Sequence, residues 1–193
     1  MTTDAHERLT ASVRRLIDAT IRTEVESDVI AAATDKIEAA TALLSKVLTP
    51  GSFGVQAAPD GRPIALGNVV IGQRNPVAPP LSIDHSEDGT VHTEFELGAA
   101  YEGPPGHVHG GVCALILDHV LGATAHQPGK PAVTGTLTLR YLRGTRLGLP
   151  LRAQAHVDRV EGTKTFALGS ITDSDGVTVE AEGIFIHPRN TAD

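Results

Sequence analysis

A carboxylate stands inside the most apolar segment of the sequence, directly after two histidines and two glycines. Residues 101–126 read YEGPPGHVHGGVCALILDHVLGATAH, with Asp118 in the middle of the apolar run. Burying a charge without a partner is costly. Asp118 is therefore either satisfied by a nearby hydroxyl or water, or placed there to react. A fixed carboxylate can serve as a general base or as a nucleophile, and we favour a catalytic role.

The glycines at 110 and 111 open a predicted helix over residues 110–125. Backbone N–H groups and the helix dipole make a helix start suited to an anion or a polarised carbonyl. Asp118 follows Gly110 by eight residues, so the two differ by about 80° around the axis and lie ~12 Å apart along it. One reacting carbonyl needs both groups at about 3 Å. The spacing predicts a dimer in which Gly110 of one chain faces Asp118 of its partner, giving two composite sites.

Other chemistries have weaker support in this stretch. His107 and His109 with His119 or His126 could suggest a metal site, but His-x-His without a defined third ligand is poor evidence. Neither a metal nor another cofactor is expected. Cys113, one turn into the helix, suits core packing better than nucleophilic attack. The sequence holds no Gly-x-Ser-x-Gly, which disfavours a serine-elbow hydrolase.

The elements around this stretch indicate an α+β fold with an antiparallel sheet. A helix that is apolar on most sides must be buried, so the sheet has to wrap around residues 110–125. Glu87-Asp88-Gly89 reads as a hairpin turn. Alternation and turn formers predict strands at 53–57, 64–71, 81–86, 90–97, 132–143, 150–160, 164–173 and 177–187.

Residues 4–48 carry an apolar stripe with three- and four-residue steps, which predicts helix. A single helix of this length would extend ~68 Å, so we expect two helices with a break near Ser27-Asp28, either of which could cap the second. The sequence thus divides into a helical extension, 1–49, and a main domain, 50–193. The extension is either a hairpin packed on the main domain or an arm for oligomerisation or partner binding.

Composition narrows the function classes. The formal net charge of −7 argues against a nucleic-acid binder, which needs a basic face. The lone cysteine excludes an intrachain disulfide and fits a reducing compartment. No secretory pattern opens the sequence, and no apolar window reaches the ~18 residues of a membrane span. We expect a cytoplasmic protein.

The motif His109-Gly110-Gly111 followed by Asp118 resembles the signature of hot-dog-fold acyl-CoA thioesterases. It is similar in particular to the branch with phenylacetyl-CoA-type (PaaI-like) and THEM-type enzymes. The similarity spans roughly residues 70–187, including a threonine that opens a strand and a Tyr-x-Arg step at residues 141–143. This resemblance implies a hot-dog fold, with an antiparallel sheet wrapped around the central helix.

The resemblance also implies roles for site residues. The Gly110 N–H would polarise the thioester carbonyl, and Asp118 would activate water or form a mixed anhydride. Thr134 would position the water or the carboxylate, and His109 would shape the helix entrance. Substrate-binding residues would be Gly111, Arg140 and Arg143. The two arginines could meet the phosphates of CoA or form only a solvated edge.

Two positions depart from the family pattern. Gly144 stands where the family usually has proline, which weakens the assignment of Arg143 to CoA. His107 stands at a usually apolar position and could alter substrate choice.

These observations favour an acyl-CoA thioesterase that works as a homodimer, with a tetramer also possible. The low aromatic content tilts the acyl group toward an aliphatic one. The alternative is a non-catalytic acyl-CoA-binding protein whose N-terminal helices form a partner-binding arm. Related hydratase chemistry expects an Asp several residues before a His. The order here is His109 and then Asp118, which disfavours it.

Overall fold

The computed structural model describes residues 2–57, 63–126 and 131–188. The chain forms two compact units. One runs to Asn68 and adds Gly72–Val77, and the other comprises Val69–Ile71 and the chain from Ala78 onward. The division expected between residues 49 and 50 stays a prediction.

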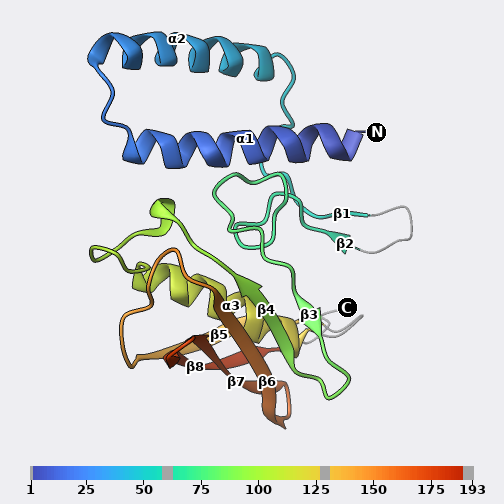
Figure 1. Cartoon of the computed structure of the whole chain (residues 1–193). Helices are drawn as coiled ribbons and strands as arrows, with labels where there is room; N and C mark the ends of the chain where they lie inside the picture. Colours follow the sequence, from blue (N-terminus) through green and yellow to red (C-terminus); the bar gives the residue numbers. More distant parts are fainter. Residues whose placement is uncertain (1, 58–62, 127–130, 189–193) are drawn as a thin grey trace. The chain divides into compact units, whose positions relative to one another are not determined.

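The second unit contains a six-stranded antiparallel sheet and one long helix (Figure 1). The strand order is β3-β4-β6-β7-β8-β5, so β5 lies at one edge. The strands are β3 (Asp84–His85), β4 (Val91–Phe95), β5 (Val133–Tyr141), β6 (Leu151–Glu161), β7 (Lys164–Asp173) and β8 (Gly176–Ile186). A short 3-10 helix, η1 (Ala99–Tyr101), precedes the long helix, α3 (Gly110–Ala125).

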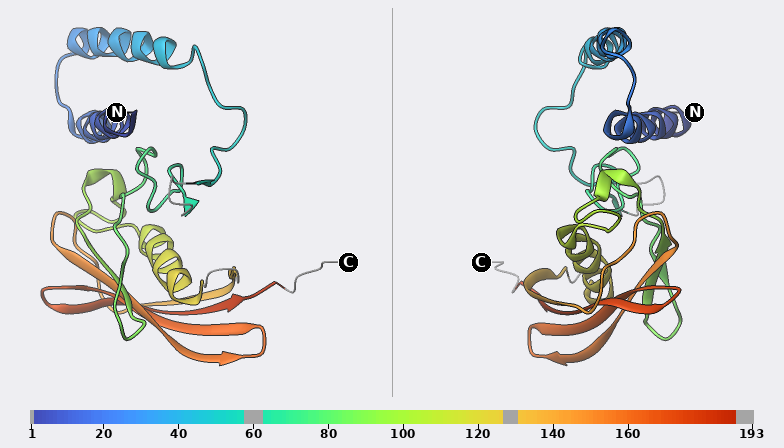
Figure 2. Two further views of the ribbon diagram at one scale, coloured as in Figure 1. Left: turned by 90° about the vertical axis from the view of Figure 1, so that its right-hand side faces the viewer. Right: turned by 60° about the vertical axis from the view of Figure 1, so that its left-hand side comes forward.

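Helix α3 is the centre of the core. Figure 2 shows the sheet curving around it. Since the helix is apolar on most sides, it buries one broad face, and the sheet lines that face with small and branched side chains. The predicted helix and the wrapped sheet are both confirmed. The buried residues of α3 are Cys113, Ile116, Leu117, Val120, Leu121 and Ala125.

The later strands agree with their predicted ranges within a few residues, but three earlier predictions were wrong in extent. Of the range 53–57 only Gln56–Ala57 is a strand. In place of a strand at 64–71 there is only β2 (Pro63–Ile64), paired with β1 (Gln56–Ala57). From Ala65 the chain closes local turns instead, with Asn68 N–H donating to Ala65 O at 2.9 Å. In the range 81–86 only β3 is a strand.

The first unit contains α1 (Thr2–Arg22) and α2 (Ser27–Leu44). The predicted break between two helices is confirmed. The prediction that Ser27 or Asp28 caps the second helix was wrong. Glu26 is the N-cap residue of α2 and makes no side-chain cap hydrogen bond. On α1, Arg14 donates to the carbonyl oxygens of Gly72 and Asn75, at 3.3 and 2.8 Å. No residue of α2 is buried.

Across the described residues, none of the helices has the length and apolarity that a membrane crossing requires.

Candidate active site

Edge strand β5 places two polar side chains against α3. Thr134 pairs across the sheet with Phe185, and Tyr141 pairs with Val179. Both partners are buried, and directly paired residues share a face of the sheet. Thr134 and Tyr141 are seven residues apart and would ordinarily point to opposite faces. A bulge at Gly135 adds one residue to β5 and brings both onto the α3 face.

Asp118 is held by the first of these residues. Thr134 Oγ1 donates a hydrogen bond of 2.8 Å to Asp118 Oδ1. The Asp118 side chain is only partly buried, in the middle of a helix whose opposite face forms the core. The hydroxyl fixes one carboxylate oxygen, and among the described residues no group donates to the other.

The start of α3 has one free donor. A helix start leaves four N–H groups without helical partners, here those of residues 109–112. His109 N–H donates to Tyr101 O, and Val112 N–H donates to His109 O, both at 2.9 Å. Gly111 N–H donates to His109 Nδ1 at 2.9 Å. Within the described part of the chain, nothing accepts from Gly110 N–H, so this group alone is available to a ligand.

His109 is therefore the N-cap of α3. Because Nδ1 accepts a hydrogen bond, the ring proton lies on Nε2. His109 thus lies at the helix entrance, and its role in the reaction stays a prediction. By contrast, the Gly111 N–H is occupied by the same bond, which leaves it no donor for substrate.

Tyr141 was missed in the sequence. Its hydroxyl donates to Gly110 O at 2.9 Å, and a Cβ at residue 110 would lie 3.2 Å from that hydroxyl oxygen. Burial raises the pKa of Tyr141, and the Cys113 thiol adds to the rise. The signal was present in the Tyr-x-Arg step. The bulge that turns this tyrosine and Thr134 to one face could not be predicted from the sequence.

A chain of buried hydroxyls anchors the first turn of α3. Cys113 Sγ contacts Thr145 Oγ1 at 3.8 Å, Thr145 donates to Thr178 Oγ1 at 2.8 Å, and Thr178 donates to Ile171 O at 3.2 Å. Burial raises the pKa of the Cys113 thiol. Cys113 is thus a packing residue, in the helix turn that carries Gly110.

His119 follows Asp118 and is half-buried. Burial lowers the pKa of His119 below its usual value, and the nearby Asp118 carboxylate opposes part of this shift. The imidazole therefore stays neutral at neutral pH and does not neutralise Asp118.

The loop before α3 is fastened to the segment after β5. Val108 N–H donates to Thr145 O at 2.8 Å, and Leu147 N–H donates to Gly106 O at 3.1 Å. His107 lies beside Gly144, where a Cβ would come within 2.9 Å of its Nε2. The two departures from the family pattern are therefore one feature, because Gly144 makes room for His107.

The two candidate arginines differ in how tightly they bind neighbouring carboxylates. Arg143 is bound to both carboxylate oxygens of Asp173 and donates to Gly176 O at 2.6 Å. These bonds hold the turn between β7 and β8. Arg140 is highly exposed and, among the described residues, forms a loose ion pair with Glu180, at 3.7 Å. The structure brings neither arginine to Asp118.

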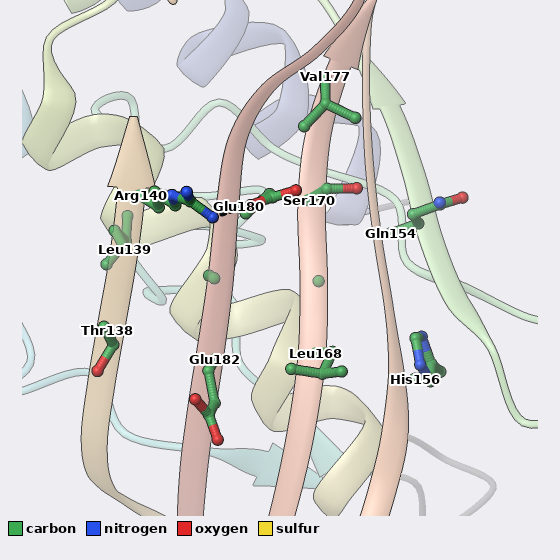
Figure 3. Close-up of a pocket in the computed structure, with 12 residues that line it drawn as sticks. Thr138, Leu139, Arg140, Gln154, His156, Leu168, Ser170, Val177, Glu180 and Glu182 are labelled. Carbon is green, nitrogen blue, oxygen red and sulfur yellow. Dashed lines mark ion pairs between the residues drawn. The ribbon is translucent and has the colours of Figure 1, made fainter. Parts of the chain in front are cut away.

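A hollow of about 500 Å³ crosses the opposite face of the sheet (Figure 3). Its side chains alternate along the strands with those that face α3, so it is separate from Asp118 and Gly110. Residues lining it include Thr138, Arg140, Gln154, His156, Leu168 and Glu182. The described residues contain no group of three potential metal ligands.

Comparison with known proteins gives the family. The model of the thioesterase superfamily matches residues 105–180. A solved thioesterase superfamily protein is 34% identical, with a TM-score of 0.84 and 94% of both chains covered. Since so little of the chain lies outside that match, most of the helical extension is included.

Two further similar proteins match about half of the chain each. Acyl-coenzyme A thioesterase THEM4 of Xenopus laevis is 34% identical over 94 residues, which are 48% of this chain and 42% of that protein. The match thus spans less than half of that relative. The Escherichia coli PaaI protein from the phenylacetic acid degradation operon has the same fold, with a TM-score of 0.53, 18% identity, and 57% and 81% of the two chains covered. The chain belongs to the thioesterase superfamily, and its fold is the hot-dog fold.

Proposed function

We propose that the protein is an acyl-CoA thioesterase that releases a carboxylic acid and free CoA. The observation that carries this proposal is the pairing of two features on α3. Asp118 is oriented by Thr134, and Gly110 N–H is the free donor of the helix start. The relative THEM4, named as an acyl-coenzyme A thioesterase, supports the substrate class.

In the first form of the mechanism, Asp118 takes a proton from water while the oxygen attacks the thioester carbonyl carbon. Gly110 N–H stabilises the negative charge that develops on the carbonyl oxygen. The C–S bond then breaks, and the departing CoA sulfur takes the proton from Asp118. In the second form, Asp118 itself attacks and expels CoA thiolate, and water hydrolyses the mixed anhydride.

Two copies of the chain would complete each site. Gly110 and Asp118 lie on one continuous helix, eight residues and thus ~12 Å apart, so one chain cannot place both on one carbonyl. Strand β5 supports the pairing, because its outer edge is open and most of its residues are exposed. Ala114, midway between the two residues, is small enough for two copies of α3 to approach. We propose a homodimer, with a tetramer possible.

Arg140 would bind a CoA phosphate only at a distance from the thioester, because its side chain lines the sheet face opposite Asp118. The bonds of Arg143 to Asp173 favour a structural role for this arginine. Because the N–H of Gly111 is occupied, Gly111 would contribute only by leaving space near the carbonyl. The low aromatic content favours an aliphatic acyl group. The single buried thiol of Cys113 supports a reducing location such as the cytoplasm.

The first test replaces Asp118 with Asn and measures CoA release over a panel of acyl-CoAs, aliphatic and aryl. We expect kcat to fall about 10²–10⁴-fold. Asp84→Asn, an exposed carboxylate on β3, is the matched control and should keep full activity. A folded Asp118→Asn protein with full turnover would overturn the assignment. Wild-type protein that binds acyl-CoA without turnover would instead favour the non-catalytic alternative.

The second test removes the donor without breaking the helix. Proline is well tolerated at the first helical position, which Gly110 occupies, and His109 has the extended backbone that a following proline requires. Gly110→Pro loses the N–H, whereas Gly110→Ala keeps it and makes the same Cβ contact with Tyr141. We expect a loss of about 10²–10³-fold in kcat for proline only.

Mixing Gly110→Pro with Asp118→Asn chains tests the composite site. A mixed dimer has one intact site, so random mixing should restore about a quarter of wild-type activity. No recovery in a mixture shown to contain mixed dimers would place each site within one chain.

A further inference from the structure

The helical unit leaves two apolar ridges without a partner. On α1 the side turned toward the rest of its unit includes buried Thr10 and part-buried Val13, Arg14 and Ile17. Another line of α1 is exposed throughout and alternates small and large residues with steps of four and three. This line, the α1 ridge, is Ala5, Leu9, Ser12, Leu16 and Ala19.

Helix α2 presents a matching line. All of its residues are exposed, and three of its large apolar side chains, those of Ile30, Ile37 and Leu44, fall on one line. That line also alternates large and small residues, with steps of three and four. This line, the α2 ridge, is Ile30, Ala33, Ile37, Ala40 and Leu44.

One antiparallel register matches all five residues of each ridge, whereas a shift of seven residues matches only three. When Leu9 is set opposite Ala40, Leu16 falls opposite Ala33. Each of the remaining three layers also places one large side chain opposite one small side chain. Such alternation lets two helices interdigitate at the usual interaxial distance of about 8–10 Å. The remaining layers are Ala5 with Leu44, Ser12 with Ile37, and Ala19 with Ile30.

We propose that α2 of one copy of the chain packs antiparallel on α1 of a second copy, and the reverse, so that two chains exchange their helices. The chain's own α2 has no buried residue and so does not cover the α1 ridge. The shared register identifies the occupant as α2 rather than a foreign helix. This inference concerns the helical unit and stands apart from the proposed hydrolysis.

The surface area requires exchange in both directions. Helix α2 is 18 residues long, about 27 Å, and a helix face is about 10 Å wide, so one contact covers on the order of 540 Å² from both sides. That is the size of a crystal contact. Two reciprocal contacts cover on the order of 1,100 Å², close to the lower limit of about 1,200 Å² for a specific interface.

Cross-linking of full-length chains tests the register and the exchange together. In a Cys113→Ser background, one preparation carries Ser12→Cys and another carries Ala40→Cys. These two positions lie in adjacent layers, about 4.5 Å apart along the axis, and both replace a small residue. After mixing under subunit exchange, a short bis-maleimide should yield covalent dimers that contain one chain of each kind.

The matched control pairs Ala19→Cys with Ala40→Cys. These positions are ten residues out of register, about 15 Å, and should give little product. Equal cross-linking of both pairs would overturn the register. A chain carrying both Ser12→Cys and Ala40→Cys that links only within itself would overturn exchange in favour of a closed hairpin, as would mixtures that yield no dimer. CoA release, measured on the same samples, tests the proposed hydrolysis separately.

Discussion

The imidazole of His107 fills the space beside Gly144 that any side chain at that position would need. A Cβ there would lie 2.9 Å from Nε2 of His107. His107 in turn is held by its Nδ1, 2.9 Å from Pro105 O. The loop before α3 can therefore place His107 here because the segment after β5 has a glycine beside it.

This match predicts a strong coupling between the two residues. Gly144→Ala should reduce the free energy of unfolding by about 1–3 kcal/mol through overpacking. In a His107→Ala background the same substitution should cost much less. A double-mutant cycle by urea unfolding measures the difference, and additive effects would show that the two side chains do not compete for space.

Thr134 is predicted to matter through its hydroxyl alone. Thr134→Val keeps the shape of the side chain but removes the hydrogen bond to Asp118 Oδ1. A hydrogen bond to a charged group contributes about 1.5–3 kcal/mol, so kcat should fall roughly 10–100-fold. Thr134→Ser should retain most of the activity. A loss of activity in Thr134→Ser without a loss in Thr134→Val would contradict this and show that the methyl group is what matters.

Acid stability should depend on Asp173. The hydrogen bond from Arg143 lowers the pKa of Asp173 from 3.8 to about 2. A depressed carboxylate pKa stabilises the fold above the unfolded-state value, and this contribution is lost as the pH falls from about 4 to about 2. Urea unfolding of wild type and Asp173→Asn should therefore differ at neutral pH and converge toward pH 2. A difference that is constant over this range would contradict the ion pair.

His119 should produce the opposite kind of pH dependence. Burial lowers its pKa below 6.5, so the unfolded chain binds the proton more readily than the folded one. Stability should therefore rise with pH up to about 6.5 and then level off. In His119→Gln this part of the slope should disappear. Melting temperatures of the two proteins between pH 5 and 7.5 provide the measurement, and parallel curves would rule out His119 as the cause.

Cys113 should be unreactive in the folded protein. Its thiol is 3% exposed, and burial raises its pKa, so little thiolate is present. Labelling with a thiol reagent should be slow in buffer and fast in denaturant. Rapid labelling of the native state would mean that the first turn of α3 opens.

The fold could be predicted from the sequence where one pattern of residues was strong. The apolar character of residues 110–125 exceeds what an exposed helix tolerates, and the helix was predicted to its last residue. The run Val69-Val70-Ile71 misled, because turns flank it on both sides, with Asn68 N–H donating to Ala65 O and Gly72 N–H donating to Asn68 O. Short apolar runs do not by themselves distinguish these outcomes.

The types of residue in the candidate site could be predicted from the sequence, but their geometry could not. Asp118 and Thr134 were expected together, and the structure joins them by a hydrogen bond. The bulge at Gly135 was hidden, since VTGTLTLRY alternates as an ordinary strand would. The engagement of Arg143 depends on Asp173, thirty residues further along the chain. No local pattern announces such a partner.

The capping of α3 by His109 also limits what kind of molecule this helix start can hold. With Gly111 N–H occupied, the end of the helix offers one hydrogen to one oxygen atom. A phosphate or sulfate is gripped by several donors at once, whereas a thioester carbonyl needs only one. In the proposed site, the cap would favour a ligand that presents one oxygen. Inorganic phosphate and the phosphates of CoA itself would therefore compete only weakly with the thioester carbonyl.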